Sequence, residues 1–592
     1  MPPPATPGSV ARSSATPTRL PTPVPSATPI PTATPTVTPA PTATSTPTAA
    51  PLVIFGNPRA AQLHPPQSDG RFPCGVVDIL DFPIDPPDAA HVSAVGQDFG
   101  VYRDQYEKYH AGEDWRGRDG TTSLGTPVYS IGHGLVTYAN PLGWGRDQGV
   151  VIVQHSLTDG NKLLSFYGHL DPPSVRLQPG DCVTRGQPVG EIGRPRTTPH
   201  LHFEIRTQSP YTPLTGYWPE DPRLAGWLPP SPTIWQLRVA NAPGVQWARP
   251  YASGITQAVG AFGDGVTVIL TAGRLLAVDV NGVERAWLPD TTDITAARLD
   301  EGAARLYVAT RRGRMEAFSL PSGPADAPMW LWGETITGAG TPQLLPLPDG
   351  GIILALRGEM WAFSADNIPL WQHTLPTAPF DWALAGDALY FSTSGSQGTV
   401  WRANAYTPPQ ALAAPGGKLT LAGGRLWIYS AEGIYRLDPG FASPPVERLI
   451  QLPAGFLPRG DIAPLADGGV LVAHPDPFDR RLIVLAADGS LRWQRSYARQ
   501  IDADVSLLTL AGLPYLLAQT VAGVQSALSL YAVNLEAQTL QRLFTGGARP
   551  AQSWQTWGLA ADREHILLNI GGGPMVLWSP EQARRILPTD GN

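Results

Sequence analysis

Short runs of alternating or wholly apolar residues recur along the chain, and they predict β-strands. In the clearest run, residues 199–205, three apolar residues alternate with His200, His202 and Glu204. Side chains two positions apart on a strand share a face, so the apolar set faces a core and the polar set faces the other way. Similar runs precede it at residues 127–131, 134–139, 149–155 and 163–169. The pattern predicts a small domain built around a β-sheet.

Beyond about residue 233 the apolar runs become periodic. Eight units end in strand-like segments, and the last residues of these segments are 34 to 48 positions apart. Fourteen of the eighteen tryptophans lie in this part of the chain. A period of roughly 40 residues with several short strands per unit is typical of β-propeller blades. We therefore expect a propeller of about eight blades over residues 233–592, with tryptophans packed between blades and residues 237–240 as a partial ninth unit.

The first 52 residues show no apolar period and are dominated by Pro, Thr, Ala and Ser. Such a composition cannot bury a core, and it predicts an extended stalk of polyproline type or a plain disordered tail. Residues 53–232 then hold the sheet-built domain, with a lead-in before it and a linker, residues 217–232, after it. The predicted fold class is all-β, with a disordered stalk, a small β-sheet domain and a propeller in that order.

Composition and charge limit which kinds of partner and which cellular locations fit the sequence. The net charge is −7 and the chain has only three lysines and no basic run, which argues against a nucleic acid partner. No apolar stretch reaches the roughly 18 residues that a membrane helix needs, so we expect no transmembrane segment. No signal peptide is visible at the start of the sequence. The stalk nevertheless favours a secreted or cell-surface protein.

The two cysteines, Cys74 and Cys182, both lie in the region of the small domain. In an exported protein they could form one disulfide that ties the lead-in to the core. Two free buried thiols fit the sequence equally well.

Candidate chemistry gathers in two stretches. His110 and Asp114 flank Gly112, which favours a turn that brings both side chains onto one ion. On the last predicted strand, His200 and His202 can both act on that metal, or one can bind it while the other does acid–base work. Two histidines and one aspartate suit Zn²⁺, and three protein ligands leave a fourth position open, as in catalytic sites. Such a metal acidifies water and polarises a carbonyl.

Hydrolysis at such a metal also needs a general base. The sequence has no His-Glu-x-x-His motif on a helix, so no glutamate is supplied in that way. Histidine can take this role near neutral pH, and His169 and His200 are the candidates.

These motifs, in this order, resemble the lysostaphin and LytM type of zinc endopeptidases, which cut peptide bonds in peptidoglycan cross-links. The resemblance covers about residues 96–207, and its motifs are residues 110–114, 125–128, 134–139, 167–170, 179–181, 186–190 and 199–204. It implies zinc bound by His110, Asp114 and His202. It also implies that His169 and His200 form the catalytic pair, as base and oxyanion stabiliser.

Two departures from the family pattern concern the surroundings of these residues. Glu113 stands where the family usually has an apolar residue. Residues 193–199 are shorter and poorer in glycine than the usual approach to the last motif. Because that segment borders the expected substrate groove, the departure bears on specificity more than on chemistry.

Two functions of different class fit the sequence. The first is an exported zinc endopeptidase that hydrolyses peptidoglycan peptides, with a propeller for targeting or for binding a protein or glycan. The second is a cell-wall-binding or adhesion scaffold without catalysis, in which the propeller is the functional module. The propeller also resembles repeats of pyrroloquinoline-quinone enzymes, but it contains no cysteine, whereas that family uses paired cysteines beside the cofactor. We therefore expect no quinone chemistry.

Overall fold

The computed structural model describes residues 53–55, 72–77, 79–85, 99–116, 124–207, 216–250 and, with short gaps, 255–580. The predicted stalk, residues 1–52, lies outside the described residues. Within them the fold is all-β as predicted, and the one α-helix is α1 (Pro230–Ala240). No helix in the described part of the chain is long and apolar enough to cross a membrane.

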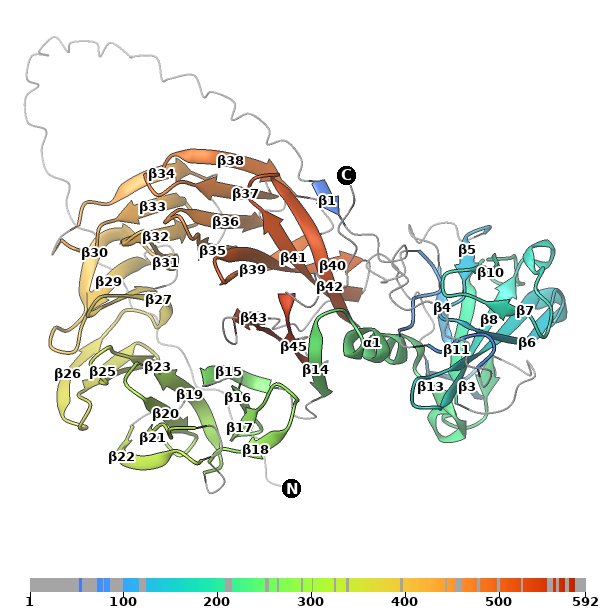
Figure 1. Cartoon of the computed structure of the whole chain (residues 1–592), viewed down its shortest axis with the longest axis horizontal. Helices are drawn as coiled ribbons and strands as arrows, with labels where there is room; N and C mark the ends of the chain where they lie inside the picture. Colours follow the sequence, from blue (N-terminus) through green and yellow to red (C-terminus); the bar gives the residue numbers. More distant parts are fainter. Residues whose placement is uncertain are drawn as a thin grey trace, which may run out of the picture. The chain divides into compact units, whose positions relative to one another are not determined.

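The small domain is built on an antiparallel sheet (Figure 1, blue to teal). In spatial order its main strands are β13 (Trp227–Leu228), β11 (Leu201–Arg206), β8 (Lys162–Leu170), β7 (Gly149–Ser156), β6 (Gly134–Asn140) and β9 (Cys182–Val183), and β4 (Glu113–Trp115) also pairs with β11. Two smaller sheets join β2 (Tyr102–Arg103), β3 (Lys108–His110) and β12 (Tyr217–Trp218), and β5 (Pro127–Tyr129) with β10 (Pro188–Glu191). The five strands predicted from the apolar runs are all present, with ends shifted by no more than two residues.

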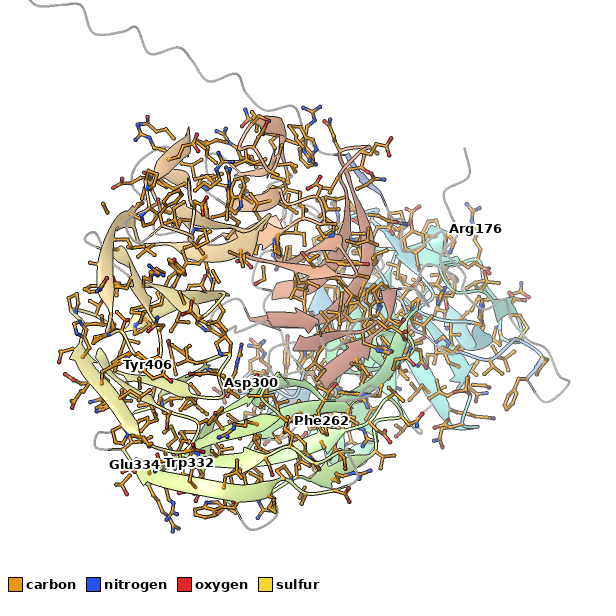
Figure 2. The ribbon with its side chains drawn as sticks, turned by 60° about the vertical axis from the view of Figure 1, so that its left-hand side comes forward. Arg176, Phe262, Asp300, Trp332, Glu334 and Tyr406 are labelled. Carbon is orange, nitrogen blue, oxygen red and sulfur yellow. A yellow bond between two sulfur atoms is a disulfide. The ribbon has the colours of Figure 1, made fainter. Side chains whose placement is uncertain are left out.

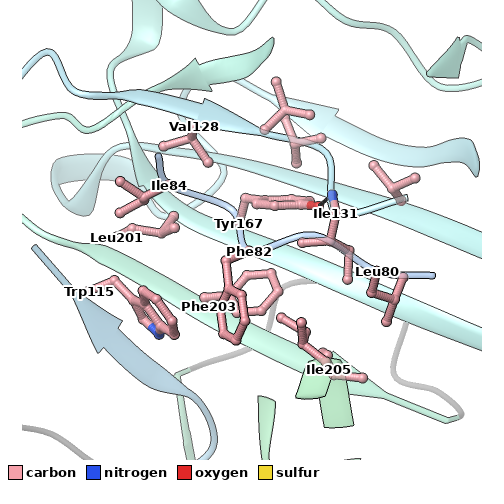
Figure 3. Close-up of a cluster of buried hydrophobic side chains, with 14 of the residues drawn as sticks. Leu80, Phe82, Ile84, Trp115, Val128, Ile131, Tyr167, Leu201, Phe203 and Ile205 are labelled. Carbon is pink, nitrogen blue, oxygen red and sulfur yellow. Dashed lines mark hydrogen bonds between the residues drawn. The ribbon is translucent and has the colours of Figure 1, made fainter. Parts of the chain in front are cut away.

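The core of this domain confirms the alternation read from the last strand. Leu201, Phe203 and Ile205 are fully buried and pack in one cluster (Figure 3). Phe82, from the lead-in, packs against Trp115 of β4 in the same cluster. The lead-in therefore supplies part of the core.

Of the two alternatives for the cysteines, the structure has the disulfide, which joins Cys74 to Cys182 of β9. The expected linker, residues 217–232, contributes β12 and β13 to the sheets of the domain. Short 3-10 turns, Gly145–Asp147, Pro172–Ser174 and Pro222–Ala225, lie between the strands.

The partial ninth unit expected at residues 237–240 is wrong, because these residues end helix α1. Pro230 at the first turn is compatible with a helix start. The buried positions Ile234, Trp235, Arg238 and Val239 repeat with a helical period, so one face of α1 is covered. Arg238 bonds to Asp81 and to the Leu80 carbonyl of the small domain.

The remaining chain forms eight sheets within the described residues, and these are arranged as a β-propeller (Figure 1, green to red). Three of them are β15–β18 (Ile255–Phe262, Val266–Thr271, Arg274–Val278, Glu284–Ala286), β19–β22 (Ile294–Asp300, Arg305–Thr310, Arg314–Ser319, Met329–Thr335) and β23–β26 (Gln343–Pro346, Ile352–Leu356, Glu359–Phe363, Pro369–Thr374). Three more are β27–β30 (Pro379–Ala385, Ala388–Thr393, Thr399–Ala403, Gln410–Pro415), β31–β34 (Lys418–Ala422, Arg425–Ser430, Gly433–Leu437, Glu447–Gln451) and β35–β38 (Asp461–Pro464, Val470–Pro475, Arg480–Leu485, Leu491–Ser496). The prediction of about eight blades stays a prediction, since sheets and blades need not correspond one to one.

The last two sheets combine strands that are distant in sequence. One consists of β39–β42 (Ile501–Leu510, Leu513–Ala522, Gln525–Asn534, Thr539–Pro550), and β1 (Val53–Phe55) pairs in parallel with its outer strand β42. The other joins β43–β45 (Trp557–Ala560, Ile566–Asn569, Pro574–Trp578) to β14 (Val245–Pro250), the first strand after α1. β14, the first strand of the propeller, thus completes the sheet that is formed by its last three strands.

Tryptophans tie neighbouring propeller sheets together, as the sequence predicts. The indole N–H of Trp332 donates to the Ala365 carbonyl of the next sheet at 2.9 Å. Trp371 makes the equivalent bond to the Asn404 carbonyl at 3.0 Å. These bonds satisfy the polar edge of each ring while its apolar body packs between sheets.

Candidate active site

Strand pairing places two of the predicted site residues directly opposite each other. β4 and β11 run antiparallel, and Asp114 pairs with His202. β8, which carries His169 near its end, pairs with β11 as well. His110 ends β3, and His200 immediately precedes β11. The fold therefore gathers these five side chains from separate segments.

Three of these side chains form a compact group of potential metal ligands. His110 Nε2 lies 3.1 Å from His202 Nδ1 and 3.3 Å from Asp114 Oδ1. His202 Nδ1 and Asp114 Oδ1 are 3.1 Å apart, and all three residues are buried. Ligand atoms bound to a tetrahedral zinc at about 2.0–2.1 Å lie roughly 3.3 Å from one another. The triangle thus has the dimensions and the donor types of a zinc site with three protein ligands.

The electrostatics of the group favour an added positive charge. Burial alone would raise the pKa of the Asp114 carboxyl, but hydrogen bonds to His110 and His202 outweigh burial and hold that pKa far below its usual value. Burial also disfavours charged His202, yet its bonds to Asp114 and Glu204 raise the pKa of His202 to about 9. A divalent cation can supply the same positive charge, and its binding releases the proton.

Glu204 holds the second ring nitrogen of His202. His202 Nε2 donates to Glu204 Oε1 at 2.8 Å, which leaves Nδ1 directed at the ligand group. The other oxygen, Oε2, accepts from Trp227 Nε1 at 2.6 Å and from Arg206 Nε at 2.5 Å. All four side chains are buried. Such a support fixes the orientation of a metal-binding imidazole.

His169 and His200 lie beside this group with their ring centroids 4.5 Å apart. His169 Nδ1 bonds to the Asp147 carbonyl at 2.7 Å, and His200 Nδ1 bonds to the Thr198 carbonyl at 2.6 Å. A carbonyl oxygen can only accept, so each Nδ1 carries the hydrogen and each neutral ring keeps a lone pair on Nε2. His200 Nε2 lies 3.5 Å from Asp114 Oδ2, at the edge of the ligand group.

Both of these histidines are neutral at physiological pH. Burial, reinforced by the nearby His200, lowers the pKa of His169 to about 3, and burial lowers the pKa of His200 as well. His169 also has a left-handed backbone, with φ +62°. A non-glycine residue pays for this conformation, and such strain is concentrated at functional sites.

The comparison with known families agrees with this geometry. Residues 108–213 match peptidase family M23. The chain contains an M23 peptidase domain. The predicted site residues His110, Asp114, His169, His200 and His202 all lie inside the matched range. None of the curated proteins compared matches the chain.

Solved structures similar to this chain include several β-propellers. BamB from Moraxella catarrhalis is 12% identical, and the match covers 56% of this chain and 98% of that one with a TM-score of 0.37. Sqt1 from Saccharomyces cerevisiae is 10% identical over 57% of this chain and 99% of that one, with a TM-score of 0.42. A computationally designed protein, Ika8, is 14% identical over 56% and 97%, with a TM-score of 0.39.

Glu113, the departure from the family pattern, has structural partners in helix α1 and on its own strand β4. Its carboxylate accepts from the Ser231 backbone N–H at 3.1 Å, from Ser231 Oγ at 2.6 Å and from Trp115 Nε1 at 3.1 Å. Ser231 lies in the first turn of α1, where unpaired N–H groups and the helix dipole favour a negative charge. The acidic residue next to Asp114 therefore caps the helix that follows the M23 domain.

Two aromatic residues at the site were not predicted from the sequence. The Trp144 ring lies 4.8 Å from the His169 ring and 5.4 Å from the His202 ring, measured between centroids. Tyr217 of β12 lies 5.3 Å from His110. Neither residue belongs to one of the sequence motifs. The only local signal is at Trp144, which lies between Gly143 and Gly145, a pattern that indicates a turn.

Proposed function

We propose that this chain is an exported zinc-dependent endopeptidase that hydrolyses peptide cross-links of bacterial peptidoglycan. The observation that carries the proposal is the buried group of His110, Asp114 and His202, whose possible ligand atoms all lie within 4.8 Å of one another. The neutral pair His169 and His200 beside it provides acid–base capacity. The M23 family supports peptide hydrolysis in general, and the cell-wall substrate is the finer step proposed here.

Each residue then has a distinct part in hydrolysis. When bound, zinc polarises the scissile carbonyl and acidifies water. Nε2 of His169 or of His200 accepts the proton that this water loses, since both atoms carry lone pairs. The protonated ring can hydrogen-bond the oxygen that becomes negative, and the proton finally passes to the leaving amine nitrogen. His110, Asp114 and His202 hold the cation, and Glu204 keeps His202 oriented.

An extracytoplasmic location fits three features. Peptidoglycan lies outside the cytoplasm. The disulfide between Cys74 and Cys182 is of the kind that persists in oxidising compartments. The Pro/Thr-rich residues 1–52 have the composition of a spacer.

The propeller serves in this proposal to target the enzyme or to bind a protein or glycan. Large side chains are exposed on it: Met329 and Trp330 are 67% and 53% exposed. Tyr406, which is labelled in Figure 2, is 78% exposed. Aromatic and methionine side chains of this kind are enriched at binding surfaces. Co-sedimentation of the inactive His200→Ala chain with purified peptidoglycan, with and without the substitution Tyr406→Ser, tests this role.

The enzymatic function is tested on the full chain with zinc and purified peptidoglycan. The measurement follows newly released amino groups, together with the zinc content of each purified variant. We expect His200→Ala to abolish release while zinc stays bound, and His110→Ala to lose both. His373→Ala, a histidine substitution in the propeller, is the matched control and should keep both.

A chain that binds zinc but releases no amino groups would contradict the enzymatic proposal. That result would favour the second function, a wall-binding scaffold whose working module is the propeller. Release that persists in His200→Ala and His169→Ala would instead remove these histidines from the chemistry.

A further inference from the structure

A charged pair joins two loops beside the M23 site. Arg196 Nε bonds to Asp147 Oδ1 at 3.0 Å and to Oδ2 at 3.1 Å, and Arg196 Nη2 also contacts Oδ2. The Arg196 backbone N–H donates to Oδ1 as well, at 3.2 Å. Asp147 belongs to the turn that begins at Gly145, and Arg196 lies in residues 193–199, the segment that departs from the family pattern.

Each partner of this pair stands beside the carbonyl that holds one of the two neutral histidines. The Asp147 carbonyl accepts from His169 Nδ1, and the Thr198 carbonyl, two residues after Arg196, accepts from His200 Nδ1. One ion pair therefore links the loop that orients His169 to the loop that orients His200. The two segments are 49 positions apart in sequence.

The same loop also holds the strained backbone at His169. The Gly193 N–H donates to the His169 carbonyl at 2.7 Å. A Cβ at Gly193 would lie 2.8 Å from the Asp171 nitrogen and 2.8 Å from Gln148 Oε1, so the loop packs closely here. The position of residues 193–196 thus bears on both the backbone and the ring of His169.

We infer that Arg196 and Asp147 form a clasp that positions His169 and His200 relative to each other and to the ligand group. The inference rests on the proposed function, because it assigns both residues a positioning role in that reaction. The Arg196 side chain is 70% exposed, and exposed ion pairs contribute little to global stability. The clasp therefore acts on the arrangement of the two loops and not on whether the domain folds.

Hydrogen exchange of the zinc-loaded full chain tests the clasp without any activity measurement. We expect Arg196→Ala and Asp147→Ala each to speed amide exchange about two- to fivefold in both loops, residues 144–148 and 193–199. Arg194→Ala removes an exposed arginine of the same loop and should leave both loops unchanged. Faster exchange only in the substituted loop, or in neither loop, would overturn the clasp.

Kinetics on peptidoglycan then separate positioning from substrate binding. Loss of alignment should lower kcat about tenfold in either single variant with little change in KM, because small misplacements of catalytic groups slow the chemical step. The double variant should be no slower than the single ones, since both substitutions break the same contact. Additive losses, or a rise in KM alone, would contradict a positioning role. If the wild-type chain released no amino groups, the proposed function would fail while the exchange experiment still decided the clasp.

Discussion

Gly112 leaves no room for a side chain against strand β11: a Cβ at this position would lie 2.5 Å from the Phe203 carbonyl oxygen. It would also lie 2.9 Å from His202 Cε1 and 2.9 Å from Glu204 Cγ. Because Gly112 sits between His110 and Asp114, the close approach of the two segments is what brings these two residues to His202.

Gly112→Ala should therefore separate the proposed metal ligands. The added methyl group must push β4 away from β11, which we expect to cost about 1–3 kcal/mol of stability and most of the zinc affinity. Zinc content after dialysis and a urea unfolding curve measure both effects. Gly323→Ala is the control, since a Cβ there meets nothing within 4 Å. Full zinc occupancy in Gly112→Ala would show that the loop can yield without disturbing the ligands.

Glu204→Gln should weaken zinc binding through His202. The glutamine keeps the shape of the side chain but loses the negative charge that supports His202 Nε2 and faces Arg206. Loss of such a support typically lowers metal affinity about 10–100-fold. Competition with a chelator of known affinity measures the change, and Glu191→Gln, an exposed glutamate of the same domain, is the control. Equal affinities in the two variants would mean that Glu204 is merely a buried partner of Arg206.

The sequence predicted the parts of the site that local patterns encode. Strand alternation placed His202 and Glu204 on one face, and the structure shows them bonded to each other. Gly112 indicated the close turn between His110 and Asp114. His200 lies one residue before the strand, and its ring is oriented by the Thr198 carbonyl, but its Nε2 still lies 3.5 Å from Asp114 Oδ2, on the side of His202 that alternation predicted.

Other contacts of the site join segments that no local pattern connects. Glu113 meets Ser231 across 118 positions, and Asp147 meets Arg196 across 49. Such pairs become visible only when the sheet brings their loops together. The strand expected at residues 237–240 was wrong because a run with three apolar residues in four fits a strand and a helix equally well, and the buried face of α1 starts before this run, at Pro230.

His155 should make the M23 domain sensitive to acid. It is buried, and its ring nitrogens bond to the His133 carbonyl at 2.8 Å and to Ser165 Oγ at 2.7 Å. Burial lowers the pKa of His155 to about 4. Between pH 6.5 and 4 the unfolded chain binds the proton and the folded chain does not, so stability falls as the pH falls. The full effect is about 3 kcal/mol.

The substitution His155→Gln tests this effect, because glutamine keeps polar atoms but does not titrate. Urea unfolding of the full chain at pH 7 and pH 4.5 should show a smaller loss of stability in His155→Gln than in the wild type. His373→Gln in the propeller is the matched histidine control. An equal loss of stability in His155→Gln and in the wild type would assign the acid sensitivity to other groups.

Asp461 should give the propeller the opposite dependence on pH. Its carboxylate, on β35, accepts from the Leu507 N–H of β39 at 2.8 Å and from the Ile462 N–H at 3.0 Å. Burial raises the pKa of Asp461 to about 6, although the charge of Lys418 opposes the shift. Between about pH 4 and 6 the folded chain therefore binds the proton and the unfolded chain does not. Stability falls as the pH rises through this window, by about 3 kcal/mol.

Asp461→Asn removes this titration and should flatten the dependence. Because the amide offers one acceptor oxygen where the carboxylate offers two, the informative quantity is the slope against pH and not the stability at one pH. Thermal unfolding of the full chain from pH 4.5 to 7 measures it, in the His155→Gln background so that the opposing slope is reduced. Asp488→Asn, an exposed aspartate of the same region, is the control. A slope that Asp461→Asn leaves unchanged would mean that water or Lys418 compensates for the burial of the carboxylate in the folded propeller.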